Sequence, residues 1–334
     1  MSRLVFLRLL VVLIILVGAA QLIAAKIIKA SAATSFTFSA VGDFGYTNNT
    51  KAVLKALGTS GVDFHLAIGD LNYDYPRVSA QQWSGYVTGA VGQTVPFEIV
   101  AGEHDTADIT QLETLLPDRI GTITGTYGEQ YFFDYPPAAP LARFIMASPG
   151  VLGAYAYKKG QADYNWVATA IDDARQKQIP WVIVGIHKYC FAISALVCTA
   201  PDLMNLLVSK KVDLILQGQL HGYQASKQLA LNPQTCPKLS TKPRTYNGNC
   251  VVNTPTPNAF SKGQGTIIVI SGTGGKSLSP DDPTDPERGY FRTWMAGNSN
   301  PTWGFSQFTV SPTQISMHFH GAAGGNFSDN FTIS

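Results

Sequence analysis

The stretch VDLILQGQLHGYQ, residues 212–224, begins as an apolar strand and ends in a polar turn. Val212–Leu216 carries the mostly apolar run expected of a strand that is buried on both faces. Gln219 and His221 follow two residues apart. Polar side chains just past a strand end are typical of ligand sites in open α/β sheets. The stretch therefore predicts a ligand site at this edge of the sheet. One of its two polar positions holds glutamine, whereas histidine is a common metal ligand.

Four other apolar runs end in the same way and alternate with helical patterns. The strands lie in residues 35–47, 62–73, 95–105 and 180–190, and the helices in residues 49–61, 80–92, 164–178 and 200–211. This alternation predicts an α/β (α+β) fold. From about Gly263 onward the pattern consists of strands, which predicts an antiparallel extension of the sheet within the same domain.

The composition is that of a globular, enzyme-sized domain. Of the 334 residues, 45% are hydrophobic and 14% are charged. This is enough apolar material for a sizeable core and excludes a disordered chain. Residues 33–334 contain neither an internal repeat nor a low-complexity linker, so we predict a single domain there.

Residues 1–32 have the pattern of a secretory signal peptide. A basic start with Arg3 leads into the apolar run Leu9–Ala20 and then into the small residues Ala30–Ala33. The alternative is an uncleaved membrane anchor, since 17 residues separate Arg8 from Lys26, at the lower limit of a span. We predict a secreted or extracytoplasmic protein, associated with a membrane only if this segment is retained.

The positive charge of the chain belongs to this N-terminal segment. The whole chain has a formal net charge of +2, but residues 1–32 hold four basic residues and no acidic one. The remainder has 20 basic and 22 acidic residues, and no basic run. The charge pattern therefore gives no indication of a nucleic-acid partner.

The chain has four cysteines: Cys190, Cys198, Cys236 and Cys250. None forms a C-x-x-C pair, which argues against a zinc ribbon or a thioredoxin motif. In an oxidising compartment two disulfides are expected, with three connectivities open. Local pairs, 190 with 198 and 236 with 250, would each close one loop. Buried free thiols are the alternative.

Polar clusters at the ends of the five strands carry the functional signal. They are GDFG with Asp43, GDLNY with Asp70 and Tyr73, GEHD with Glu103 and His104, VGIH with His187, and GQLH with Gln219 and His221. Each has a structural explanation when taken alone, because aspartate beside glycine closes turns and a lone histidine is commonly a hydrogen-bonded core residue. Together they supply the carboxylates and nitrogen ligands that two metal ions, roughly 3.5–4 Å apart, require.

The order of these clusters resembles the calcineurin-like metallophosphoesterases, and within them the purple acid phosphatase-like branch. The family pattern is G-D-x-G, G-D-x-x-Y, G-N-H-[ED], V-x-x-H and G-H-x-H, and the GDLNY element points to the purple branch. The resemblance covers about residues 36–334. It implies two packed mixed β-sheets flanked by helices, a metallophosphoesterase-like sandwich.

The resemblance also implies roles for individual residues. Asp43, Asp70, Tyr73 and His221 would hold the first metal ion, with Asp70 bridging to the second. His187 would bind the second metal ion, and His104 would assist the substrate phosphate or the leaving group.

Two residues depart from the family pattern, and both fall on the second metal position. Glu103 stands in place of asparagine, and Gln219 in place of the first histidine of G-H-x-H. The second ligand set becomes Asp70, Glu103, His187 and Gln219. Such oxygen-rich ligation favours Mn²⁺, Mg²⁺ or Ca²⁺ over Zn²⁺ or Cu²⁺.

The sequence thus predicts an exported phosphoesterase that uses one or two metal ions, drawn from Fe, Mn, Zn, Mg or Ca. A metal-bound hydroxide would attack phosphate monoesters, small phosphorylated molecules being the substrates, and His104 would act as general acid or phosphate contact. The alternative is a catalytically weakened relative that binds a phosphorylated ligand or a partner, because Glu103 and Gln219 alter the second metal position.

Overall fold

A computed structural model describes residues 35–152, 157–188, 190–195, 197–253 and 258–334. Residues 35–334 belong to one compact unit. The predicted signal peptide or anchor, residues 1–32, lies outside the described residues. Among the helices that are described, none combines the length and the apolar character needed to cross a membrane.

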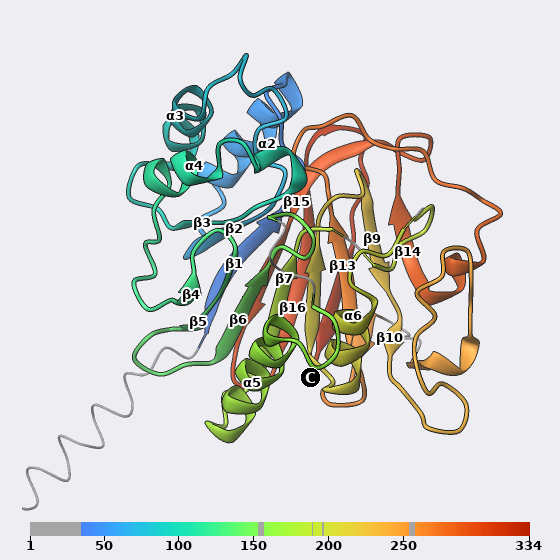
Figure 1. Cartoon of the computed structure of the whole chain (residues 1–334). Coiled ribbons are helices and arrows are strands. Elements are labelled where there is room, and N and C mark those ends of the chain that lie inside the picture. The colour runs from blue at the N-terminus through green and yellow to red at the C-terminus, as the bar shows by residue number, and fades with distance from the viewer. Residues whose placement is uncertain (1–34, 153–156, 189, 196, 254–257) are drawn as a thin grey trace, which may run out of the picture. The chain divides into compact units, whose positions relative to one another are not determined.

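The first sheet has seven strands in the order β12-β17-β16-β15-β1-β2-β3 (Figure 1). Its strands are β1 (Phe36–Val41), β2 (Phe64–Ile68), β3 (Phe97–Val100), β12 (Ala259–Phe260), β15 (Thr302–Val310), β16 (Ile315–Gly324) and β17 (Asn330–Ile333). β1, β2 and β3 are parallel, whereas β15 joins β1 in antiparallel register. Three carboxyl ends of parallel strands therefore meet along one edge of this sheet.

The second sheet has eight strands in the order β14-β9-β13-β8-β7-β6-β5-β4. Its strands are β4 (Thr124–Thr126), β5 (Gln130–Tyr135), β6 (Ala142–Ala147), β7 (Trp181–Ile186), β8 (Leu214–Gln217), β9 (Tyr223–Ser226), β13 (Ile267–Ser271) and β14 (Phe291–Met295). β6, β7, β8 and β13 are parallel neighbours. A short separate ribbon pairs β10 (Gln228–Leu229) with β11 (Val251–Asn253).

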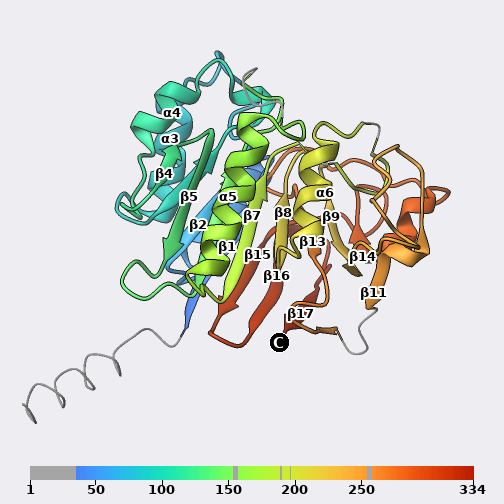
Figure 2. The same ribbon diagram turned by 60° about the horizontal axis from the view of Figure 1, so that its bottom comes forward.

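Helices cover the outer faces of both sheets. The helices are α2 (Asn48–Gly58), α3 (Ala80–Val91) and α4 (Ile109–Leu115) on the first sheet, and α5 (Ala162–Gln176) and α6 (Pro201–Ser209) on the second. Figure 2 shows α5 and α6 lying along the face of the second sheet. The result is a four-layer arrangement of helices, sheet, sheet and helices, which confirms the predicted fold class.

The core between the sheets is rich in phenylalanine. Phe38 of β1 stacks on Phe64 of β2 with ring centroids 5.5 Å apart, and Phe144 of β6 meets both rings edge-on at 5.0 and 5.2 Å. All three side chains are fully buried. Burial of each such side chain contributes about 1.5–3 kcal/mol, so these contacts help to hold the sheets face to face.

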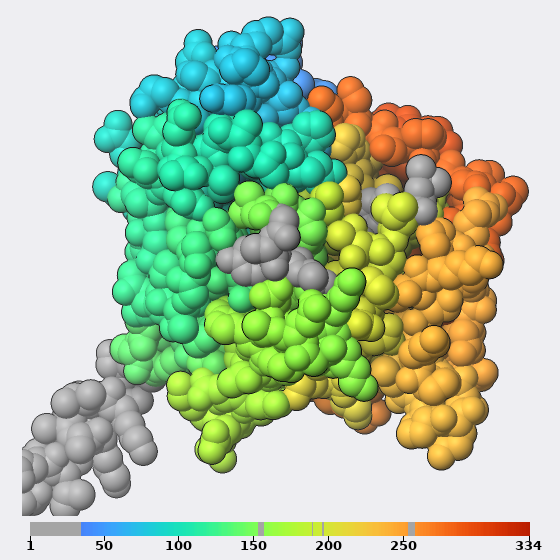
Figure 3. Space-filling view, viewed as in Figure 1, coloured from blue at the N-terminus to red at the C-terminus, as the bar shows by residue number. Residues whose placement is uncertain are grey.

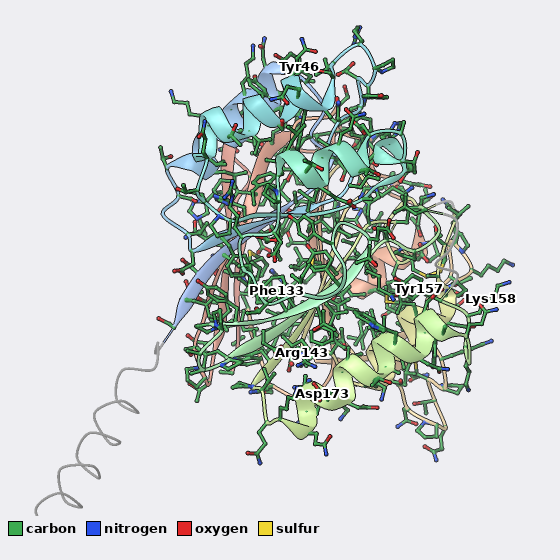
Figure 4. All side chains as sticks on the ribbon, turned by 60° about the vertical axis from the view of Figure 1, so that its left-hand side comes forward. Tyr46, Phe133, Arg143, Tyr157, Lys158 and Asp173 are labelled. Carbon is green, nitrogen blue, oxygen red and sulfur yellow. A yellow bond between two sulfur atoms is a disulfide. The ribbon has the colours of Figure 1, made fainter. Side chains whose placement is uncertain are left out.

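A buried arginine fastens α5 to the second sheet. The Arg143 guanidinium donates to both carboxylate oxygens of Asp134 at 2.6 and 2.7 Å, and to Asp173 of α5 at 2.6 Å (Figure 4). Its side chain is fully buried. Such a charge remains buried only because it is paired and hydrogen-bonded.

Local sequence signals place the helix starts beside the turns that follow β1 and β2. Thr47 caps α2, since its hydroxyl accepts from the Thr50 N–H, and Ser79 caps α3 through Gln82 in the same way. The Thr47 hydroxyl also donates to the Gly275 carbonyl at 2.9 Å. The turn after β1 is thereby tied to the glycine-rich loop after β13.

The C-terminal strands differ from the prediction of one antiparallel extension. β13 lies parallel to β8 inside the second sheet, and β15–β17 extend the first sheet antiparallel to β1. The physical reason is that a fully apolar strand such as Ile267–Ser271 is suited to a central position between other strands. The helix α4 and the strands β4–β6 were not predicted from the sequence.

Candidate metal centre

The polar turns predicted from the sequence meet at one edge of the two-sheet core. They follow β1, β2 and β3 of the first sheet and β7 and β8 of the second. A cavity of ≈ 440 Å³ opens there, and its wall includes Asp70, Tyr73, Glu103, His104, Gln219 and His221. In the space-filling view the blue-to-cyan part of the chain and the orange part adjoin at the top of the molecule (Figure 3).

The first half of the centre consists of Asp43, Tyr73 and His221. The Tyr73 hydroxyl lies 2.8 Å from Asp43 Oδ1 and 2.8 Å from His221 Nε2. Asp43 is fully buried, and its other carboxylate oxygen accepts from the Gln219 N–H at 2.9 Å. These polar groups hold one another in place, so the first half is pre-organised.

The second half of the centre consists of Glu103, His187 and Gln219, with Asp70 between the halves. His187 Nε2 lies 3.3 Å from Asp70 Oδ1 and 3.1 Å from Glu103 Oε2. The Gln219 amide donates to Glu103 Oε1 at 2.6 Å. The structure therefore brings together all seven residues predicted as ligands.

Both histidines present the nitrogen that a metal ion would need. His187 Nδ1 lies 2.8 Å from the Ile68 carbonyl, and His221 Nδ1 lies 3.0 Å from the Ser277 carbonyl. A carbonyl oxygen only accepts, so each Nδ1 carries the hydrogen and donates it. Each Nε2 is then directed at the carboxylates. A backbone acceptor that fixes the ring of a histidine is the common support of a metal ligand.

Glycines beside the acidic residues give the ligands room. A Cβ on Gly69 would lie 2.4 Å from the ring of His187, and a Cβ on Gly102 would lie 2.1 Å from Asp70 Oδ1. Gly69 also has φ +69°, a left-handed conformation that glycine adopts at little cost. The glycines of the GDLNY and GEHD motifs therefore serve the packing of side chains from other strands.

His104 lies at the mouth of the cavity. Its ring centroid is 4.3 Å from that of Tyr73, and its backbone N–H donates to Asp70 Oδ1 at 3.0 Å. Its side chain is exposed. This position is compatible with contact to a substrate, whereas the predicted ligands lie deeper.

Asp105 links two of the turns, a role that was not predicted from the sequence. Its Oδ1 accepts from the N–H groups of Leu71 and Asn72 at 2.8 and 3.2 Å, and its Oδ2 from the Gly102 N–H at 2.8 Å. Burial, together with the charge of Asp70, raises the pKa of Asp105 to about 7. Its place in the GEHD motif was the available signal.

Other residues that line the cavity belong to none of the predicted motifs. Ser194, Ser279 and Pro280 also line the cavity, and Ser277 supplies the carbonyl that orients His221. Ser194 belongs to the loop closed by the disulfide Cys190–Cys198. The second disulfide joins Cys236 to Cys250, so the structure contains the two local pairs.

The clustered carboxylates set the protonation of the histidines. Burial opposes a charged imidazole, yet Asp70 and Glu103 hold the pKa of His187 well above its usual value. Burial also opposes charge on His221, but Asp43 raises its pKa. Burial would raise the pKa of Asp70, but the charge of His187 lowers it. Protons and a cation therefore compete for this centre.

The donor atoms fit a divalent cation. In the second half the buried Gln219 Oε1 has no hydrogen-bond partner among the described residues, and the buried Glu103 Oε2 and His187 Nε2 face each other at 3.1 Å. Two ligands about 2.1 Å from a cation and at a right angle are about 3.0 Å apart. The 3.1 and 3.3 Å separations around His187 Nε2 are close to this value. Ligand atoms of Asp43, Asp70 and His187 all lie within 4.8 Å of one another.

A two-sheet α/β sandwich with carboxylates and histidines at the strand ends defines a metallophosphoesterase fold, and comparisons with known proteins agree. No protein-family model matches the chain. A probable inactive purple acid phosphatase of Arabidopsis thaliana is 23% identical over 307 residues, covering 86% of this chain and 45% of that protein. A purple acid phosphatase of Glycine max is 23% identical over 213 residues, covering 58% of this chain and 45% of that protein.

Solved structures share the fold. The purple acid phosphatase PPD1 from yellow lupin (Lupinus luteus) seeds has a TM-score of 0.66 at 18% identity, covering 91% of this chain and 54% of that chain. The structure of PhoD has a TM-score of 0.58 at 11% identity, covering 90% of this chain and 70% of that chain. The chain spans about half the length of the first curated relatives it matches: it covers 45% of one and 46% of the other.

The relatives and the shared fold support the family that the motifs indicated. The chain is similar in sequence to purple acid phosphatases and shares the fold of one of them. The relatives include proteins named as inactive, so the family alone does not establish turnover.

Proposed function

We propose that this protein is a metal-dependent phosphoesterase that hydrolyses phosphate monoesters outside the cytoplasm. The observation that carries the proposal is the orientation of His187 and His221. Each donates from Nδ1 to a backbone carbonyl and presents Nε2 to carboxylates beside one cavity. A purely structural histidine has no need of both features.

The proposal uses the two ligand sets that the family resemblance implies. Asp43, Asp70, Tyr73 and His221 would hold the first ion, and Asp70, Glu103, His187 and Gln219 the second. When bound, the ions would polarise the phosphoryl oxygen and lower the pKa of bound water. The chain's own contribution is to hold the ligands rigid and to place His104 where it can donate a proton to the leaving group or bind the phosphate.

The extracytoplasmic location rests on two features. Both disulfides suit an oxidising compartment, and residues 1–32 have the pattern of a signal peptide. If that segment is retained, the same domain would act while tethered to a membrane.

A second candidate function is binding without turnover. Glu103 and Gln219 are hydrogen-bonded to each other at the second metal position, and relatives named as inactive exist. A protein of this kind would retain the cavity of ≈ 440 Å³ and bind a phosphorylated ligand or a partner.

Phosphate release from an aryl phosphomonoester distinguishes the two candidates. The purified protein is assayed metal-free and with Mn²⁺, Mg²⁺, Ca²⁺, Zn²⁺ or iron, alongside Asp70→Asn. We expect turnover that requires metal and that Asp70→Asn lowers by roughly 10³-fold or more, since a shared ligand of both ions is lost. A folded protein that binds metal and shows no turnover with any ion would support the binding function.

A further inference from the structure

The two side chains that depart from the family pattern contact each other. Gln219 Nε2 donates to Glu103 Oε1 at 2.6 Å. This bond leaves the buried Gln219 Oε1 without a hydrogen-bond partner, and the buried Glu103 Oε2 facing His187 Nε2 at 3.1 Å. Buried polar atoms of this kind are rare unless a ligand or an ion satisfies them.

The contact determines which way the glutamine amide points. An amide has a donor end and an acceptor end, and an ionised carboxylate only accepts. Turning the Gln219 amide over would place its oxygen against Glu103 Oε1 and break the bond. Glu103 therefore takes the amide nitrogen and leaves the amide oxygen free for a cation.

The backbone under both side chains is fixed by other parts of the centre. Gln219 has φ +70°, a sparsely populated conformation for a residue other than glycine, and its N–H donates to Asp43 Oδ2. Glu103 follows Gly102, whose N–H donates to Asp105. The two side chains thus start from anchored positions 116 residues apart in the sequence.

We propose that Glu103 and Gln219 act as a coupled pair, in which the Glu103 carboxylate orients the Gln219 amide oxygen toward the second cation. This inference rests on the proposed metal centre but not on its catalytic activity. Glu103 is then both a ligand and the positioning residue for Gln219. With Asp70 and His187, the pair supplies three oxygens and one nitrogen, a donor set suited to a hard ion such as Mn²⁺, Mg²⁺ or Ca²⁺.

Metal affinity in a double-mutant cycle tests the coupling. Calorimetry on the metal-free wild type, Glu103→Asn, Gln219→His and the double variant would follow Mn²⁺ and Zn²⁺ binding, with bound metal counted by elemental analysis. The binding event at the first position serves as internal control and should change little. In the double variant, the ratio of Zn²⁺ to Mn²⁺ affinity at the second position should rise at least tenfold, because an imidazole replaces an amide oxygen.

Coupling should appear as non-additivity. Each single substitution should lower Mn²⁺ affinity by about 10–100-fold, and the double variant should lose less than the product of the two losses. The proposal would be overturned if the loss of Mn²⁺ affinity in the double variant equalled the product of the two single losses. An unchanged ratio of Zn²⁺ to Mn²⁺ affinity at the second position would also overturn it.

A further variant keeps the test usable if the double variant does not fold. Gln219→Met retains the length of the side chain and removes the amide. It should lower Mn²⁺ affinity at the second position at least tenfold and Zn²⁺ affinity by less, while unchanged Mn²⁺ affinity would refute an oxygen ligand there. Phosphate release is measured separately. If the two substitutions are coupled in metal binding but the protein shows no turnover, only the proposed phosphoesterase activity is rejected. If the protein shows turnover but the two losses of Mn²⁺ affinity are independent, only the coupling of Glu103 and Gln219 is rejected.

Discussion

The two halves of the metal centre stand on the same edge of the fold and differ in how their polar groups are satisfied. In the first half the Tyr73 hydroxyl lies within 2.8 Å of both Asp43 and His221. In the second half the buried Gln219 Oε1 has no hydrogen-bond partner, and the buried Glu103 Oε2 faces His187 Nε2 at 3.1 Å. The first half is assembled by its own side chains, whereas we propose that a cation completes the second half.

The difference shows that two ligand sets of similar size can have different energetics. Unsatisfied buried polar atoms cost about 1–3 kcal/mol each, more when charged. A cation that satisfies them recovers this free energy on binding. We therefore expect the first half to depend on the integrity of its hydrogen bonds, and the second half to depend on ion identity and pH.

The largest effect should come from the buried carboxylate of the first half. Asp43→Asn removes a charge that accepts from Tyr73 and from the Gln219 N–H. Because a metal ligand supplies several kcal/mol of electrostatic stabilisation, kcat/KM should fall roughly 10³-fold. Steady-state kinetics on the metal-loaded enzyme would measure this. Asp172→Asn, on the exposed face of α5, is the matched control, and a variant with more than a tenth of wild-type activity would contradict the assignment.

The phenol of the first half should have the next largest effect. Tyr73→Phe leaves Asp43 Oδ1 and His221 Nε2 without their shared partner, and kcat/KM should fall by about 10–100-fold. If the phenolate binds Fe³⁺, the iron-loaded wild type should show a visible charge-transfer band that this variant lacks. Tyr75→Phe in the same loop should leave the band intact. An iron-loaded wild type that is colourless would show that Tyr73 is not a ligand.

The same contrast separates what the sequence could predict from what it could not. Each predicted ligand belongs to a short motif just past an apolar strand, and parallel strands bring such ends together. The position of Asp43, Asp70 or His187 therefore follows from local pattern and strand direction. The first half, whose ligands all match the motifs, is the half that sequence reasoning describes best.

Contacts between distant segments could not be predicted from the sequence. The bond between Gln219 and Glu103 joins residues 116 apart, and Asp105 links the turns that follow two different strands. Likewise, an apolar run such as Ile267–Ser271 does not reveal which sheet it enters, so β13 was not assigned to the second sheet. Pairing depends on tertiary context, which a local pattern does not contain.

A smaller effect should separate the halves by pH. Opposing the effect of burial, Asp70 and Glu103 hold the pKa of His187 well above its usual value. Below that raised pKa the metal-free centre holds a proton on His187 that a cation must displace, so affinity at the second position should rise with pH, about tenfold per unit. Calorimetry of Mn²⁺ binding from pH 6 to pH 8, in buffers of different ionisation enthalpy, should detect about one released proton.

Glu103→Gln provides the comparison for this pH dependence. It removes one of the two charges that favour the protonated His187, so fewer protons should be released at pH 7 than in the wild type. Affinity that is flat across this pH range, with no proton released, would rule out His187 as a site of competition between proton and cation.

The smallest expected effect comes from Lys276, whose ammonium group contacts the first half. Lys276 Nζ lies 4.0 Å from the centroid of the Tyr73 ring, and its backbone N–H donates to the Asp43 carbonyl at 3.0 Å. A cation–π contact of this kind is worth about 0.5–2 kcal/mol, so Lys276→Met should lower kcat/KM by roughly 2–30-fold. Lys51→Met is the matched control, because Lys51 makes the same type of contact with Tyr86 at 5.7 Å. Since the contact acts on the Tyr73 ring, the loss should be accompanied by a shifted phenolate band in the iron-loaded protein. If kcat/KM fell equally in both lysine variants and the phenolate band did not shift, Lys276 would not act through the Tyr73 ring.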